Sequence, residues 1–356
     1  MNIRKIITLL LCVFLLFSLF SACTEGDISS EEPQKQARSF YDLFDTVSVI
    51  ISYAGDSQET FAANADAVAS LLEEYHKLFD IYYEYSGINN LKTINQNAGK
   101  SPVKVDERLV DFLIYAKEIY ELTDGKTNVA MGSVLTLWHN EREIAADSPA
   151  SAKLPSSAEI AEAATHTNID NLIIDKENRT VYISDPDMRL DVGALGKGYA
   201  TEKAAELLIS KGVTSYVLNI GGNIRAIGEK VTGDGWITGI TNPDRTSEES
   251  FVCKVNIKNI SLVTSGDYER FYTVDGINYH HIIDPVTNMP ANYFSSVSVF
   301  TLDSGLADAL STALFCMSYD DGLSLIEKLG DVDVIWVTKN GEILSTDGVD
   351  FYIDQP

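Results

Sequence analysis

Short strand patterns follow one another along the second half of the chain, and their order limits the fold more than any other feature. Runs rich in β-branched and apolar residues lie at 215–220, 224–227, 236–241, 251–257, 261–265, 295–301, 332–338 and 343–345. Only two helical patterns interrupt them, after 301 and at 322–329. Because helices and strands do not alternate regularly, the sequence predicts an α+β domain with mixed or antiparallel sheets and flanking helices.

The first half of the chain is expected to add two long helices. One apolar stripe at helical spacing predicts a helix over 58–80, and a second amphipathic pattern covers 107–122. A strand is predicted at 44–52 and a hairpin at 171–183. The charged segment 140–156, which contains Pro and Ser, is predicted to be an exposed loop.

A glycine-rich turn within 190–212 is a candidate phosphate site. A strand ends at Asp191, and a helix is expected to begin near Lys197. A helix start behind such a turn offers free N–H groups and a partial positive charge to an anion. The spacing from Gly193 to Lys197 is one residue too short for a Walker A loop, and Gly198 replaces the required Ser or Thr. An ordinary glycine turn is the alternative.

The helix expected after the strand at 295–301 carries a candidate metal site. Leu306, Leu310 and Leu314 form its apolar stripe, while Asp308 and Thr312 are neighbours on another face. A carboxylate beside a hydroxyl is a pair of oxygen ligands that suits Mg²⁺ bound together with phosphates. The alternative is a solvated surface or a local cap.

Three tyrosines, Tyr82, Tyr83 and Tyr85, lie where the first long helix gives way to a loop. They are interpreted either as an aromatic-capped turn or as a stacking platform for a flat ring.

The amino terminus predicts export. Basic and then apolar residues over 1–22 are typical of a signal peptide, and the ending FSAC resembles a lipobox whose Cys23 is lipidated after cleavage. Residues 24–38 contain almost nothing apolar and are predicted to be a disordered tether. The folded domain is expected over 39–356.

Charge and metal-ligand spacing narrow the function further. The formal net charge of −25 argues against nucleic acid as a partner and against binding an anionic membrane through basic patches. An anionic ligand would therefore need a local cation. The chain has no Cys/His spacing typical of a metal site, and His76, His139 and His166 are scattered and receive no role.

Eight motifs, in order, resemble the ApbE-type FAD:protein FMN transferases. They are FDT at Phe44, YYEYS at Tyr82, NVAMGSVLTLW at Asn128, LDVGALGKGYA at Leu190, NIGGNIRAIG at Asn219, TSGDYERFY at Thr264, HHIIDPVT at His280 and ADALST at Ala307. Together they cover nearly all of 39–356. The resemblance implies a T-fold-like α+β domain that uses Mg²⁺ to transfer FMN from FAD, its substrate, to a Thr or Ser hydroxyl of a partner redox flavoprotein, releasing AMP.

The resemblance also implies roles for individual residues. The metal would be held by the carbonyl of Ala194 together with Asp308 and Thr312. His281 matches the proposed general base, with Asp284 as the rival base or as the group that orients His281.

Seven positions match the flavin-nucleotide contacts of the family. These residues, from four segments of the chain, are Tyr82, Lys126, Thr127, Asn128, Asp191, Lys197 and Ile283.

Some positions depart from the family pattern. Phe44 replaces a Met, Asn128-Val129-Ala130 replaces Asp-Pro-Thr, Asn288 replaces a Gly, and Ser311 stands where some members carry Asp. These changes affect ligand details and leave the class intact.

Two alternatives to transfer stay open: an FAD pyrophosphatase that gives FMN and AMP, and a non-enzymatic flavin-binding lipoprotein. In each case the lipid is expected to anchor the protein on the outer face of the bacterial cytoplasmic membrane.

Overall fold

The computed structural model describes residues 34–353 of the 356-residue chain. The predicted signal peptide, Cys23 and most of the predicted tether lie outside the described residues. The tether prediction is wrong at its end, because 36–38 belong to a strand in which Gln36 pairs with Ser52 and Arg38 with Ile50. Within 34–353, no helix is long and apolar enough to cross a membrane.

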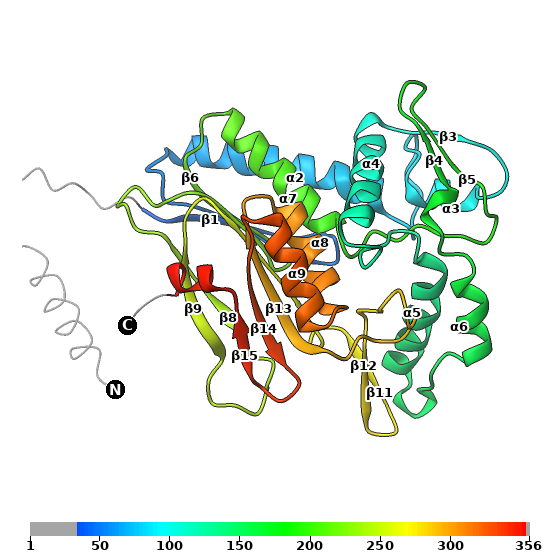
Figure 1. The fold of residues 1–356 in the computed structure, drawn as a ribbon. Coiled ribbons are helices and arrows are strands. Elements are labelled where there is room, and N and C mark those ends of the chain that lie inside the picture. Colours follow the sequence, from blue (N-terminus) through cyan, green and yellow to red (C-terminus); the bar gives the residue numbers. More distant parts are fainter. Residues whose placement is uncertain (1–33, 354–356) are drawn as a thin grey trace, which may run out of the picture. The chain divides into compact units, whose positions relative to one another are not determined.

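An eight-stranded sheet forms the centre of the domain, and every neighbouring pair of its strands is antiparallel (Figure 1). In spatial order its strands are β1 (Gln36–Leu43), β2 (Thr46–Ser52), β6 (Ser215–Ile220), β7 (Asn223–Gly228), β10 (Ser261–Gly266), β13 (Phe294–Thr301), β14 (Asp333–Thr338) and β15 (Ile343–Ser345). The predicted α+β class and most of the predicted strands are confirmed.

Some of the helices pack on one face of this sheet and supply one side of its core, and the others lie beside it (Figure 1). They are α2 (Gln58–Phe79), α3 (Leu91–Gln96), α4 (Glu107–Leu122), α5 (Gly132–Asp147), α6 (Ser157–Ala164), α7 (Gly196–Ser210), α8 (Ser304–Phe315) and α9 (Tyr319–Leu329), with short 3-10 turns at Pro149–Ser151, Ile169–Asn171 and Asp347–Phe351. The predictions of helices over 58–80 and 107–122 are confirmed.

Alternation along the central strands gives the sheet two apolar faces. In β6, Tyr216 and Leu218 pack into the core formed with α2 and α7, while Val217 between them packs on the opposite face. There it meets Trp236 and Val255 of a separate hairpin. The sheet therefore lies between a helical layer and a β layer. Because both of its faces are covered, the central strands carry apolar side chains on both sides.

Three small sheets complete the domain. Their strands are β3 (Val103–Lys104), β5 (Thr180–Ile183) and β4 (Leu172–Asp175) in one sheet, β8 (Trp236–Thr241) with β9 (Phe251–Ile257), and β11 (Phe271–Val274) with β12 (Ile277–His280). The predicted hairpin at 171–183 is confirmed as β4–β5.

Two local predictions are wrong. The predicted strand at 44–52 begins at Thr46, because Phe44 and Asp45 take left-handed backbone angles (φ 55° and 51°) in the turn after β1. The predicted loop 140–156 is helical up to Asp147, since its first eight residues contain no Gly or Pro and continue α5. Both differences lie next to candidate site residues.

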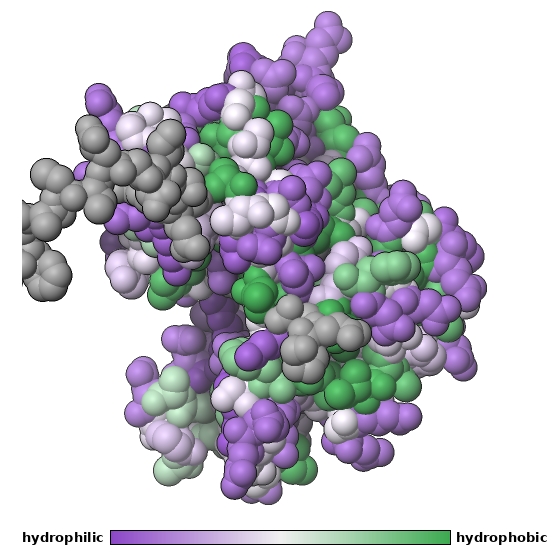
Figure 2. Space-filling model, turned by 90° about the vertical axis from the view of Figure 1, so that its left-hand side faces the viewer, coloured by the Kyte–Doolittle hydropathy of each residue, from purple (hydrophilic) through white to green (hydrophobic). Residues whose placement is uncertain are grey.

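Polar side chains dominate the surface shown in Figure 2, with separate hydrophobic patches between them. This agrees with the acidic composition of the chain.

Candidate active site

The start of α7 packs directly against α8. The backbone N–H of Gly198 donates a hydrogen bond to Asp308 Oδ2 at 2.7 Å. A Cβ at Gly198 would lie 2.3 Å from Asp308 Cβ and 2.4 Å from the Ser304 carbonyl oxygen. Only glycine fits this contact, so the glycine turn positions the carboxylate at the amino end of α7.

Asp308 is almost fully buried and lies beside a cation. It is 5% exposed, and Lys197 Nζ is 3.8 Å from its Oδ2. Burial raises the pKa of Asp308, while Lys197 and the Gly198 N–H act in the opposite direction. The Oδ1 atom accepts no hydrogen bond from the described residues and remains free for a further positive charge.

The predicted metal ligands Ala194, Asp308 and Thr312 offer a carbonyl, a carboxylate and a hydroxyl. These are the oxygen donors that Mg²⁺ prefers, and so small a set leaves coordination positions for water and phosphate. The Thr312 hydroxyl lies 3.4 Å from Ser265 Oγ, which is also 2.9 Å from Ser311 Oγ. Ser311 is fully buried and donates to the Asp308 carbonyl at 2.9 Å, so its hydroxyl supports α8.

The segment Lys126–Asn128 connects α8 to the rest of the site. Thr127 is buried, and its hydroxyl donates to the Ala309 carbonyl at 2.8 Å. Asn128 accepts from Ala130 N at 2.8 Å and donates to the Thr167 carbonyl at 3.0 Å. The predicted nucleotide segment is thus held on α8, and the Lys126 side chain extends from it to Asp284.

Lys126 reaches the second predicted carboxylate. Its Nζ lies 3.1 Å from Asp284 Oδ1, which also accepts from Val286 N at 3.0 Å. Asp284 is 4% exposed, so the pair is shielded from water. Ile283 packs in the neighbouring apolar cluster. Asn288 has φ 57°, which explains why a glycine suits this position in the family pattern.

His281 is held as a neutral base. Its Nδ1 lies 3.2 Å from the Arg270 carbonyl oxygen, and because that oxygen only accepts, Nδ1 carries the proton and Nε2 keeps its lone pair. Burial, Arg270 and then the neighbouring cations lower the pKa of His281 to about 3. The orienting group is therefore the Arg270 carbonyl, which the sequence did not single out, and no hydrogen bond joins His281 to Asp284 among the described residues.

Asp191 and Tyr82 lie at the other side of the site. Asp191 Oδ1 accepts from Gly193 N at 2.9 Å, and burial raises its pKa. Burial and then the charge of Asp191 raise the pKa of Tyr82 to about 12. The Tyr82 ring is 50% exposed and lies 5.5 Å from the His139 ring between centroids. The Tyr85 hydroxyl donates to Asp80 Oδ2 at 2.7 Å, so the predicted aromatic-capped turn is present. This turn leaves the Tyr82 side chain exposed.

Sequence reasoning missed the cation on α5. Arg142 Nη2 lies 2.9 Å from His139 Nδ1, and burial and then Arg270 lower the pKa of Arg142. Its charge acts on both Asp191 and His281. The available signal was the spacing of Val134, Trp138 and Ala145, all buried, which extends the helix past the predicted loop start.

Arg142, Arg270 and Lys197 all act on His281, and Lys197 also contacts Asp308. These positive charges act on His281 together with its burial, so this side of the site favours an anion. Cations, a neutral base and a helix start that lie close together suit a phosphate-containing ligand.

The chain belongs to the ApbE family, whose model matches residues 44–336. A FAD:protein FMN transferase from Treponema pallidum is 34% identical over 73% of each chain, and one from Klebsiella pneumoniae is 30% identical over 79% of this chain and 84% of its own length. The ApbE protein of Thermotoga maritima superposes with a TM-score of 0.79 at 28% identity, covering 90% of this chain and all of that one. The flavin transferase ApbE from Vibrio cholerae has the same fold, with a TM-score of 0.73.

Proposed function

We propose that this protein transfers FMN from FAD to a Thr or Ser hydroxyl of a partner flavoprotein and releases AMP. The curated relatives named above carry this activity in their names. The observation in this chain that supports it most directly is the His281 geometry, a neutral imidazole with a free Nε2 among cations.

The reaction replaces the pyrophosphate (phosphoanhydride) linkage of FAD with a phosphate ester to the acceptor. The acceptor hydroxyl oxygen forms a bond to the FMN phosphorus, the pyrophosphate P–O bond breaks, and AMP leaves with the bridging oxygen. His281 Nε2 takes the hydroxyl proton. An anionic pyrophosphate beside Arg142, Arg270 and Lys197 offsets the charges that lower the pKa of His281, so ligand binding strengthens the base.

The oxygen donors of Asp308, Thr312 and Ala194 fit Mg²⁺. Bound there, the ion would neutralise charge on the pyrophosphate oxygens. Lys197 complements it from the start of α7, where the free N–H groups also favour an anion. The exposed Tyr82 ring is placed to stack on a flat ring.

Asp284 acts as a positioning group. Its carboxylate is already paired with Lys126 and a backbone N–H, so accepting a proton would break a shielded ion pair. We therefore assign the base to His281 and the placement of Lys126 to Asp284.

Mass spectrometry of an acceptor protein incubated with FAD, Mg²⁺ and the full chain tests this function. We expect an FMN adduct on a Thr or Ser, abolished by His281→Ala and by Asp308→Ala, with Asp331→Ala as an exposed carboxylate control. FMN and AMP without an adduct would instead indicate the pyrophosphatase. Bound, intact FAD in every variant would leave only the flavin carrier.

Lipidation of Cys23 and a location on the outer face of the cytoplasmic membrane belong to the same proposal. The acceptor is then an exported or membrane redox flavoprotein. Cys23→Ser should move the protein from the membrane fraction to the soluble fraction and remove the acyl mass. An unchanged distribution would reject the lipid anchor and leave the catalytic proposal untouched.

A further inference from the structure

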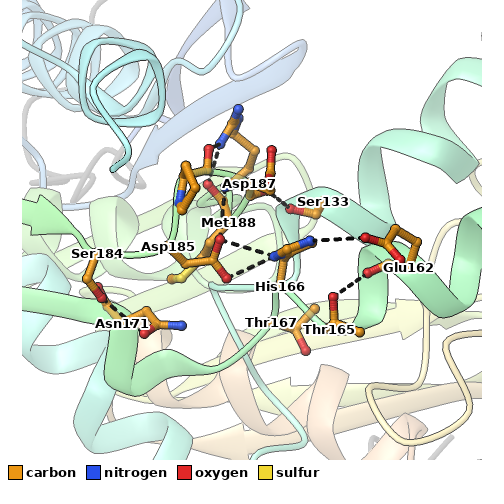
Figure 3. A network of polar contacts seen from close by, with 12 residues as sticks. Ser133, Glu162, Thr165, His166, Thr167, Asn171, Ser184, Asp185, Asp187 and Met188 are labelled. Carbon is orange, nitrogen blue, oxygen red and sulfur yellow. Dashed lines mark hydrogen bonds and ion pairs between the residues drawn. The ribbon is translucent and has the colours of Figure 1, made fainter. Parts of the chain in front are cut away.

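A group of side chains of the kinds that ligate metals lies outside the candidate active site, where the loop after β5 meets the end of α6 (Figure 3). His166, Asp185 and Asp187 each offer one ligand atom, and these atoms lie within 4.8 Å of one another. We propose that these three residues bind one divalent transition-metal ion, such as Zn²⁺. The proposal rests on these side chains and the adjoining pocket, and it is independent of the flavin chemistry.

The distances around His166 suit a shared metal. Its Nδ1 lies 2.9 and 3.1 Å from the two carboxylate oxygens of Asp185. Two ligands of one tetrahedral Zn²⁺, with bonds of about 2.0–2.1 Å, lie only slightly farther apart. The ion takes the place of the proton that Nδ1 and Asp185 now share. The Asp187 carboxylate is exposed and has no hydrogen bond or ion pair within 34–353, so it is free to turn toward the ion.

A pocket opens directly onto this group. Its volume is about 620 Å³, and Ser133, Glu159, Glu162, His166 and Asp187 are among its lining residues. His166 Nε2 lies 3.8 Å from Glu162 Oε1, which is longer than a hydrogen bond. Figure 3 shows Glu162 and Ser133 on the side of His166 away from Asp185. The pocket gives an entry path for the ion and space for a water in the remaining position.

The local charge favours a cation. The carboxylates of Glu162, Asp185 and Asp187 surround a single imidazole. The nearby Arg189 forms no ion pair with these carboxylates within 34–353; its Nη1 instead donates to the carbonyls of Pro186 and Met188, at 2.7 Å each. Protonated His166 offsets only one negative charge, whereas a divalent ion offsets two.

The ligand chemistry distinguishes this group from the Asp308 site. An imidazole with carboxylates suits Zn²⁺ and related ions, whereas the all-oxygen set at Asp308 suits Mg²⁺.

The proposed site also joins segments that are distant in the sequence. Ser133 Oγ donates to the Asp187 carbonyl at 2.7 Å, and the residue after His166 accepts from Asn128. A bound ion therefore ties α6 to the loop that leads to Asp191.

Metal titration of the full chain, stripped with chelator, tests the proposal. Zn²⁺ binding is measured by calorimetry, and Co²⁺ binding by its visible absorption. We expect the wild-type chain to bind one ion at this site. His166→Gln and Asp187→Asn should each weaken the affinity of this site for the ion by at least about tenfold. Asp170→Asn, which removes a nearby exposed carboxylate, and Asp308→Ala should both retain that ion.

Circular dichroism shows whether each variant is folded, and Asp187→Asn changes only an exposed side chain. Failure of the wild-type chain to bind Zn²⁺ or Co²⁺ would overturn the proposal and leave a plain His166–Asp185 ion pair. Full retention of the ion in Asp187→Asn and His166→Gln, or its loss in Asp308→Ala alone, would also overturn it. None of these results depends on FAD or on an acceptor.

Discussion

At the scale of single residues, the proton positions on His281 decide what the site can do. The Arg270 carbonyl fixes the proton on Nδ1, and burial together with the surrounding cations keeps the imidazole neutral. The sequence named His281 and Asp284 as rival bases because both lie in one motif. Only the structure separates them, since it pairs Asp284 with Lys126, which is 158 residues away in the chain.

The lowered pKa of His281 predicts a specific pH dependence of stability. The unfolded chain binds a proton at His281 below about pH 6.5, whereas the folded chain does so only near pH 3. The free energy of unfolding therefore falls as the pH drops from 6.5. We expect His281→Gln to lose less stability than the wild type between pH 7 and pH 5, as measured by urea unfolding. Titrating groups that both proteins share cancel when the two free energies of unfolding are subtracted. If the two plots of stability against pH run parallel, the lowered pKa assigned to His281 is wrong.

At the scale of elements, the length of α5 places a cation, Arg142, in the candidate site, and the sequence analysis did not identify it. A helix ending near residue 140 would leave Arg142 in a loop, but α5 continues to Asp147 and places it beside His139. Charged residues hid this extension, because Glu and Arg are good helix formers as well as common loop residues. The strands were predictable by contrast, since runs rich in β-branched and aromatic residues, such as Val334–Val337, favour the strand conformation.

Removing that cation should weaken FAD binding. A charge-assisted hydrogen bond contributes about 1.5–3 kcal/mol, so Arg142→Ala is expected to raise the Kd for FAD by about tenfold to a hundredfold. Arg245→Ala removes an exposed arginine and should leave the Kd unchanged. Flavin fluorescence titration measures both, and equal affinities would remove Arg142 from the site.

A buried ion pair joins three elements behind the site. Glu202 Oε2 on α7 lies 3.1 Å from Arg225 Nε on β7 and accepts from Ser304 N, the first residue of α8, at 2.8 Å. Glu202→Ala would leave Arg225, 3% exposed, without its partner, at a cost of about 3–5 kcal/mol.

On the same helix, Glu206 pairs with Lys203 in solvent. Glu206→Ala should therefore cost less than about 1 kcal/mol. Denaturant unfolding of the two variants compares them directly, and similar losses would mean that Arg225 finds other partners.

At the scale of the whole molecule, the domain begins earlier than its composition suggested. Residues 36–38 are polar or small, which made them look like tether, but they pair along β2, and Arg38 binds Asp66 on α2 at 2.6 Å. Backbone pairing does not depend on hydrophobicity, so composition cannot detect it. A chain that starts at Ser39 should unfold at a lower urea concentration than one that starts at Gln34. Coincident midpoints would place the boundary at Ser39.

The fold class followed from local patterns, but the site depended on contacts between distant segments. The polar contacts Lys126–Asp284, Thr127–Ala309 and Gly198–Asp308 join residues that are 158, 182 and 110 positions apart. Such long loops close late in folding. Segments that come before α8, such as Lys126–Asn128 and the start of α7, gain these partners only once the chain has been made through α8, so a fragment that ends before α8 should not hold flavin. Flavin binding therefore reports the completion of the whole domain.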